Sequence, residues 1–205
     1  MLVDSHCHLN MTEFNKDLES VISNAQNNQI NGMLTICTEL EELNEIRNIS
    51  HKNKNIWYSG GVHPNNVKNC IDDNLNIIKE YAYDKKFIAI GETGLDYYYE
   101  NPKKEIQKTS FIKHINIARE LNLPLIVHTR DADKDTIDIL HAQYKKGKFK
   151  GVIHCFSASE ELAMEALAIN FFISVSGIVT FKNAESIRQT IKKVPLSKLL
   201  VETDA

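Results

Sequence analysis

Eight short apolar segments, separated by stretches with helical periodicity, constrain the fold of this chain more than any other feature. The segments are rich in β-branched and other apolar residues, and runs of this kind are typical of buried strands. They cover residues 2–6, 32–37, 56–62, 87–92, 123–128, 151–156, 171–177 and 198–203. We therefore predict eight strands.

The segments between them carry apolar residues at the spacing of one helix face. The stripes are Phe14, Leu18, Val21 and Ala25; Phe111, Ile115, Ala118 and Leu121; Ile137, Leu140 and Tyr144; and Ala184, Ile187, Ile191 and Val194. Strands that alternate with helices predict right-handed βαβ units and a parallel sheet. The expected fold is α/β, a (β/α)8 TIM barrel that forms one domain over residues 1–205, although about 250 residues is more typical of that fold.

The sequence ends at Ala205, directly after the eighth expected strand. The last helix of such a barrel is therefore expected to be missing. Two explanations stay open: the chain is a C-terminally truncated fragment, or the barrel leaves its last strand partly uncovered.

Charge and cysteine content narrow the classes of function. The net charge of −3 gives no general attraction to nucleic acid or to an anionic membrane, so a phosphate-bearing substrate would need a local positive site. Four cysteines without a CxxC pair, and no signal peptide, indicate reduced thiols and a cytoplasmic protein. No apolar run approaches the roughly 20 residues that span a bilayer, so no membrane association is expected.

Most of the histidines lie where the expected strands end. His6 and His8 end the first strand, His63 follows the third, and His128 and His154 end the fifth and sixth. Because alternate residues of a strand share a face, the first two should project side by side. Active sites of such barrels lie at the carboxyl ends of the strands. These histidines should therefore meet at the active-site face.

Two carboxylates complete the group, Glu92 at the end of the fourth strand and Asp204 after the eighth. Imidazole and carboxylate ligands suit zinc, manganese and similar divalent ions. The predicted metal ligands are His6, His8, Glu92, His128, His154 and Asp204. Two ions about 3.5–4 Å apart need a bridging anion, and we assign that role to Glu92. The first two histidines and Asp204 would hold one ion, and the last two histidines the other; Asp204 could also orient or deprotonate a water.

Six motifs in order, VDSHCHLN, GVHP, GETGLDYY, PLIVHTR, HCFS and VPLSKLLVETDA, extend along the whole chain. With them the sequence resembles the TatD family of metal-dependent deoxyribonucleases, within the wider amidohydrolase-like barrels. The resemblance implies two divalent ions (Mg, Mn or Zn), held by the same six residues. It also implies hydrolysis of DNA phosphodiester bonds by metal-activated water, as a 3′–5′ exonuclease that prefers single strands. In the family a proline, a basic loop and a final helix follow ETDA, and this sequence lacks them.

Three further residues are candidates for substrate contact. Arg130 could grip a phosphate with two N–H groups, or pair with a neighbouring aspartate. The run LDYYYENPKK (95–104) should lie on the active-site face, where Tyr97 could stack on a base and Lys103 meet a phosphate.

His63, which we group with Glu92 and Asp204 as catalytic, could bind phosphate, protonate the leaving group or hold a loop.

Other residues near the ligands receive no role. Cys7 and Cys155 each adjoin a ligand in sequence and should therefore point away from the site. The basic run KKGKFK (145–150) leads into the sixth strand from the opposite face, where it should be solvated surface.

Two alternative functions stay open. A metal-dependent esterase, deacylase or amidohydrolase could use the same ions, although amidohydrolases often bridge their metals with a carbamylated lysine and FIAIGETG contains none. An inactive truncated homologue would expose apolar surface on its last strands. The partner that we expect is single-stranded DNA as substrate, without an obligate protein partner.

Overall fold

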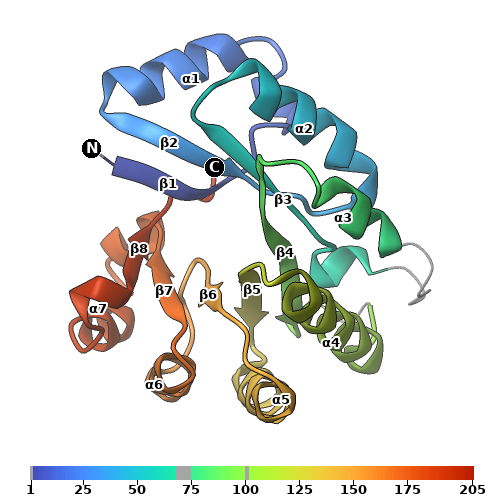
Figure 1. The fold of residues 1–205 in the computed structure, drawn as a ribbon. Helices are drawn as coiled ribbons and strands as arrows, with labels where there is room; N and C mark the ends of the chain where they lie inside the picture. The colour runs from blue at the N-terminus through green and yellow to red at the C-terminus, as the bar shows by residue number, and fades with distance from the viewer. Residues whose placement is uncertain (1, 68–74, 100–101) are drawn as a thin grey trace.

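The computed structural model describes residues 2–67, 75–99 and 102–205, which form a ring of parallel strands surrounded by helices (Figure 1). Eight strands pair in chain order, β1 to β8, and every pair is parallel. They are β1 (Leu2–Cys7), β2 (Ile30–Thr35), β3 (Ile56–Gly60), β4 (Phe87–Asp96), β5 (Leu125–Arg130), β6 (Gly151–Ile153), β7 (Phe172–Val175) and β8 (Leu199–Val201). All eight predicted strands are therefore present, with ends that differ by a few residues.

Helices follow the strands around the outside of the ring (Figure 1). They are α1 (Leu18–Asn27), α2 (Leu43–Lys52), α3 (Asn76–Tyr81), α4 (Lys104–Leu121), α5 (Asp133–Lys146), α6 (Glu160–Ala168) and α7 (Glu185–Ile191). Short 3-10 turns cover Thr12–Phe14, Leu40–Glu42, Pro64–Asn66, Gly177–Thr180 and Leu196–Lys198. The predicted (β/α)8 barrel is confirmed, and in the described residues no helix follows β8.

The helical stripes bury the faces that their spacing predicts. In α4, Phe111, Ile115 and Ala118 are fully buried and join the main apolar core between the helices and the sheet. The first stripe is partly wrong, because Phe14 lies in a 3-10 turn before α1 and the buried residue of that helix is Ile22. None of the helices in the described part of the chain is long and apolar enough to cross a membrane.

Segments 2–8 and 201–205 meet where the ring closes. The Asp204 amide donates to the His6 carbonyl at 3.0 Å, and the His8 amide donates to the Ala205 carbonyl at 2.6 Å. The buried Asp4 carboxylate accepts from the backbone and the hydroxyl of Thr203 at 3.0 and 2.6 Å. These bonds hold two predicted ligands, His6 and Asp204, side by side.

Two glycines let β4 lie unusually close to β5. Gly94 has a φ of 142°, and a Cβ there would lie 2.0 Å from the His128 carbonyl oxygen. Gly91 has a φ of 130°, and a Cβ there would lie 2.6 Å from the Ile126 carbonyl oxygen. A larger residue would be strained at either position and would push β5 away. Both glycines flank Glu92, so they bring its carboxylate next to the β5 histidine.

Candidate active site

A pocket of about 590 Å³ opens at the carboxyl ends of the strands. Its lining contains five of the six predicted metal ligands, and the sixth, His6, lies fully buried directly beneath it. The lining residues used below are His8, His63, Glu92, His128, Arg130, His154, Cys155 and Asp204. The barrel thus brings together side chains from six different strand ends, as the positions in the sequence predict.

Glu92 lies at the centre of this group, and its two carboxylate oxygens face different histidines. Oε1 lies 2.8 Å from His154 Nε2 and 3.0 Å from His128 Nδ1. Oε2 lies 3.3 Å from His6 Nε2 and 4.0 Å from His8 Nε2. The side chain is only 3% exposed. One carboxylate therefore joins two separate pairs of nitrogen ligands.

Asp204 completes the group around Oε2 of Glu92. Its Oδ1 lies 3.5 Å from His6 Nε2 and 3.7 Å from His8 Nε2. With a third of its side chain exposed to the pocket, it is more accessible than Glu92. The predicted division into two ligand sets is therefore compatible with the geometry.

The ligand atoms fit cations better than they fit one another. His6 Nε2 and His8 Nε2 lie 3.2 Å apart, as do His128 Nδ1 and His154 Nε2. Within each pair at most one nitrogen can donate a proton to the other, whereas both nitrogens can give a lone pair to a cation that lies between them and the carboxylates. The described residues form three groups with mutual ligand-atom distances within 4.8 Å: His6, His8 and Glu92; His63, Glu92 and His128; and His6, His154 and Glu202. Nitrogen and oxygen ligands of this kind suit a borderline divalent ion.

Burial and charge set the protonation of the central residues in opposite directions. Burial would raise the pKa of Glu92, but the surrounding imidazoles, His154 foremost, hold it well below its ordinary value. Burial would lower the pKa of His154, but Glu92 and Glu202 hold it well above its ordinary value. The site therefore favours an ionised carboxylate facing positive charge, which is the charge arrangement that a bound cation would provide.

His63 lies at the wall of the pocket with one ring nitrogen already engaged. The Asn65 amide donates to its Nδ1 at 3.1 Å, so the proton of the neutral ring must be on Nε2. Nε2 lies 3.5 Å from Glu92 Oε1. Burial lowers the pKa of His63 to about 4. His63 is thus a neutral N–H donor that faces the predicted bridging carboxylate.

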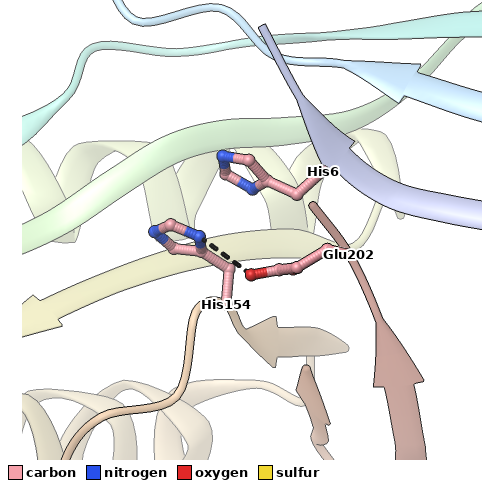
Figure 2. A group of neighbouring side chains, drawn as sticks. All are labelled: His6, His154 and Glu202. Carbon is pink, nitrogen blue, oxygen red and sulfur yellow. Dashed lines mark ion pairs between the residues drawn. The ribbon is translucent and has the colours of Figure 1, made fainter. Parts of the chain in front are cut away.

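Glu202 is a part of the site that our sequence analysis missed. Its carboxylate Oε1 lies 3.5 Å from His154 Nδ1. Figure 2 shows the two side chains facing each other, joined by the dashed line of this ion pair. Glu202 also accepts from the Cys155 amide and from the Ser174 hydroxyl. Glu202 therefore orients His154 from behind, as acidic residues commonly orient metal-bound histidines. Glu202 precedes Asp204 by two residues, and residues two apart in an extended segment share a side. This spacing could have indicated Glu202 from the sequence.

Asp96 has the same relation to His128. Its Oδ2 lies 3.3 Å from His128 Nε2 and accepts from the Asn65 side-chain amide at 2.9 Å. Its Oδ1 accepts from the Tyr98 amide at 3.0 Å. Burial would raise the pKa of Asp96, but the bonds to His128 and Asn65 lower it to about 2. The long strand β4 thus supplies both Glu92 and the carboxylate that orients a ligand of the next strand.

The three predicted substrate residues lie in different surroundings. Arg130 is exposed and lines the pocket, and no hydrogen bond or ion pair engages its side chain in the part of the chain that the structure describes. The Tyr97 hydroxyl donates to Asp135 at 2.7 Å, and its ring packs against the core. Lys103 is exposed immediately before α4 and is not among the described residues of the pocket wall.

The two cysteines next to ligands differ from each other. Cys7 points away from the pocket as expected, with its thiol donating to the Leu34 carbonyl. The prediction for Cys155 is wrong, because this residue lines the pocket and its sulfur lies 3.1 Å from the Ser176 hydroxyl. The strand β6 ends at Ile153, and a φ of 41° at Cys155 breaks the alternation of sides. Burial raises the pKa of this thiol to about 12, so it is a poor nucleophile at neutral pH.

Residues 3–205 match the family model described as TatD related DNase. The chain belongs to the TatD family. Its relatives include the uncharacterized metal-dependent hydrolase YcfH of Escherichia coli K12, 44% identical over all of this chain and 77% of the relative. The 3'-5' ssDNA/RNA exonuclease TatD of Shigella flexneri is 29% identical over all of this chain and 78% of the relative.

A solved structure agrees with this assignment. The TatD homologue YJJV of Escherichia coli K12 superposes with a TM-score of 0.92 and 27% identity, over all of this chain and 79% of that one. Both the predicted family and the predicted fold are confirmed. This TatD-family member is therefore a metal-dependent hydrolase that acts on ester bonds.

Proposed function

We propose that the chain is a two-metal phosphodiesterase that removes nucleotides from single-stranded DNA in the 3′ to 5′ direction. The observation that carries this proposal is the position of Glu92, whose two oxygens face two separate pairs of histidines. A single carboxylate between two nitrogen-rich ligand sets is the arrangement that a pair of divalent ions requires. The relative named as a 3'-5' ssDNA/RNA exonuclease supports the choice of substrate and polarity.

The distances support the predicted ligand sets. His6, His8 and Asp204 would hold one ion and His128 and His154 the other, with Glu92 shared. When bound, Mg, Mn or Zn would supply Lewis acidity toward the phosphate and lower the pKa of a coordinated water. Glu202 and Asp96 would fix the tautomers and the orientation of the two histidines that they contact.

The remaining pocket residues have roles that suit a phosphodiester. Asp204 is the most accessible carboxylate of the group, and we assign to it the orientation and deprotonation of the attacking water. His63 directs an N–H toward Glu92, where it can donate to a phosphate or leaving-group oxygen. Arg130, exposed and without a hydrogen bond or ion pair to its side chain among the described residues, would bind a phosphate with two N–H groups. Tyr97 is engaged with Asp135, so we assign it no direct contact with the substrate.

The amidase alternative has less support from the pocket. None of the described residues in its lining is a lysine, so the carbamylated bridge typical of many amidohydrolases has no donor there. The thiols of Cys7, Cys37 and Cys155 are unpaired, which favours a reducing compartment, and we place the protein in the cytoplasm.

The test is nucleotide release from a 5′-labelled single-stranded oligonucleotide with Mn²⁺ or Mg²⁺. We expect stepwise shortening from the 3′ end that stops with EDTA and is almost abolished in Glu92→Gln. The control is Glu165→Gln, which removes a half-exposed carboxylate from a surface pair with His141 at 2.9 Å. Equal activity of Glu92→Gln and the control would refute the proposal, as would cleavage that continues in EDTA.

A further inference from the structure

Two tyrosines and one arginine at the edge of the pocket lie outside the metal machinery. Tyr98 and Tyr99 lie two and three residues after the end of β4, and they remain 57% and 53% exposed. Exposed neighbouring aromatic residues on the active-site face are unusual, because burial of such rings is the ordinary outcome of folding. Their rings lie 4.9 Å apart between centroids and are nearly perpendicular, at 89°.

Arg130 connects the tyrosines to the pocket. Its guanidinium carbon lies 3.7 Å from the centroid of the Tyr98 ring and 5.8 Å from that of Tyr99. The same arginine lines the pocket together with Glu92 and His128. A cation stacked on an aromatic face keeps its N–H groups at the rim of the stack, where they can donate to another partner. The aromatic pair therefore lies next to the predicted metal site, because Arg130 contacts the pair and also lines the pocket.

Hydrogen bonds hold the backbone next to the tyrosines in place. The Tyr98 amide donates to Asp96 Oδ1 at 3.0 Å, and the other oxygen of that carboxylate faces His128. Gln107 donates to the Asp96 carbonyl at 2.9 Å and accepts from the Asp96 amide at 2.8 Å. Asp96 therefore ties the aromatic pair and a predicted metal ligand to the same carboxylate.

We propose that Tyr98, Tyr99 and Arg130 form a stacking platform that holds unpaired nucleobases of the substrate beside the metal site. This inference rests on the proposed nuclease function and specifies how its substrate is recognised. Arg130 would bind the phosphate and the tyrosine faces would bind the bases, a combination typical of proteins that bind single strands without sequence preference. Since the rings are perpendicular, a base that stacks on one meets the other with its edge.

The platform explains a preference for single strands in physical terms. In a duplex both faces of a base are covered by its neighbours, so stacking on a tyrosine would require the duplex to open locally. The chain has a net charge of −3 and cannot rely on a general attraction to the phosphate backbone. Base stacking is a source of affinity that does not need a basic surface.

The experiment measures the affinity of a fluorescent single-stranded 12-mer by anisotropy, with Ca²⁺ in place of Mn²⁺ and a gel to confirm that the DNA remains intact. Base–aromatic stacking is worth about 5- to 150-fold in affinity per base. We expect Tyr98→Ala/Tyr99→Ala to weaken binding by about that factor, and Tyr98→Phe to bind like the unsubstituted chain. A 12-mer with abasic sites at its three 3′-terminal positions should bind weakly to the unsubstituted chain and lose little further in the double variant.

Tyr83→Ala is the matched control, because Tyr83 is 91% exposed and lies before β4, at the opposite end of the barrel. Thermal unfolding of each variant reports whether it folds. Equal affinity of the double variant and Tyr83→Ala for the intact 12-mer would overturn the platform, and so would no measurable binding by the unsubstituted chain.

Hydrolysis of bis(p-nitrophenyl) phosphate with Mn²⁺ tests the proposed function separately, since this small ester has no nucleobase. We expect the unsubstituted chain and Tyr83→Ala to hydrolyse it at equal rates, in a reaction that stops with EDTA. No hydrolysis with tyrosine-dependent binding would overturn the phosphodiesterase and keep the platform. Hydrolysis of the ester together with DNA binding that does not depend on the tyrosines would support the phosphodiesterase and overturn the platform.

Discussion

The buried carboxylate of Glu202 allows a prediction that can be worked out in detail. Glu202 is not one of the six predicted metal ligands, but it contacts one of them, His154, on the side away from the pocket. Its side chain is 1% exposed, 3.5 Å from His154 Nδ1. Glu202→Gln keeps the size and the acceptor for the Cys155 amide but removes the negative charge. Loss of such an orienting carboxylate typically costs 10- to 100-fold in metal affinity, or about 1.4–2.7 kcal/mol.

Glu202→Ala should do more, since it leaves the Cys155 amide unpaired, whereas the Ser174 hydroxyl keeps the Ser5 hydroxyl at 3.1 Å as a partner. At about 1–3 kcal/mol for an unpaired buried group, we expect the free energy of unfolding to fall by about 1–3 kcal/mol. Urea unfolding in EDTA measures this cost without a contribution from metal. The glutamine variant should lose at most about 1 kcal/mol in the same assay.

The metal affinity is measured by competition with a fluorescent chelator, with Zn²⁺ as the probe. Glu165→Gln is the control, because it removes a carboxylate from a histidine at the surface, where such a pair contributes about 0–1 kcal/mol. If Glu202→Gln binds Zn²⁺ within a factor of two of that control, then Glu202 does not orient a metal ligand and the reasoning fails.

Three further predictions concern other parts of the molecule. His114 is buried, its pKa is lowered to about 4 by burial, and it accepts from the Val62 amide at 3.1 Å. The unfolded chain therefore binds this proton more readily, so the free energy of unfolding should fall as the pH drops from about 6.5 to about 4, by up to 1.4 kcal/mol per unit. Urea unfolding of His114→Gln should lack this part of the slope, and parallel pH curves would contradict it. Arg130→Ala should raise KM for the oligonucleotide about 10- to 100-fold with partial recovery in Arg130→Lys, and unchanged KM values would exclude a phosphate contact. Gly94→Ala should destabilise the fold by about 3 kcal/mol or more in urea unfolding, because a Cβ there would lie 2.0 Å from the His128 carbonyl oxygen; a loss below about 1 kcal/mol would contradict this.

The fold could be predicted because apolar strand segments alternate with helical stripes along the whole chain. Each buried strand is a short apolar run, and the strict alternation with helical stripes leaves few architectures. The least accurate part was the first helix, where Phe14 has the correct spacing but lies in a 3-10 turn. Tertiary packing determines where a helix begins and ends, and the periodicity of the sequence alone does not give these boundaries.

The predicted ligands could be found because parallel strands bring their carboxyl ends together whatever the distance in sequence. The supporting carboxylates Glu202 and Asp96 were missed, because their role depends on the orientation of the His154 and His128 rings, which the sequence does not give. Cys155 was misplaced because alternation was extended beyond the end of β6, where the backbone enters the left-handed region. Period-two reasoning holds within a strand and fails at its first irregular residue.

The measurement that tests the central claim most directly is the divalent metal content of the purified chain and of single-ligand variants, by elemental analysis after dialysis. The geometry predicts about two ions per chain, about one in His8→Ala and in His128→Ala, and close to none in Glu92→Gln, because both ligand sets share that carboxylate. The surface variant Glu165→Gln should keep both. Two ions retained in a folded Glu92→Gln chain would contradict the account, and so would a folded unsubstituted chain that binds no ion even when Mn²⁺ or Zn²⁺ is supplied.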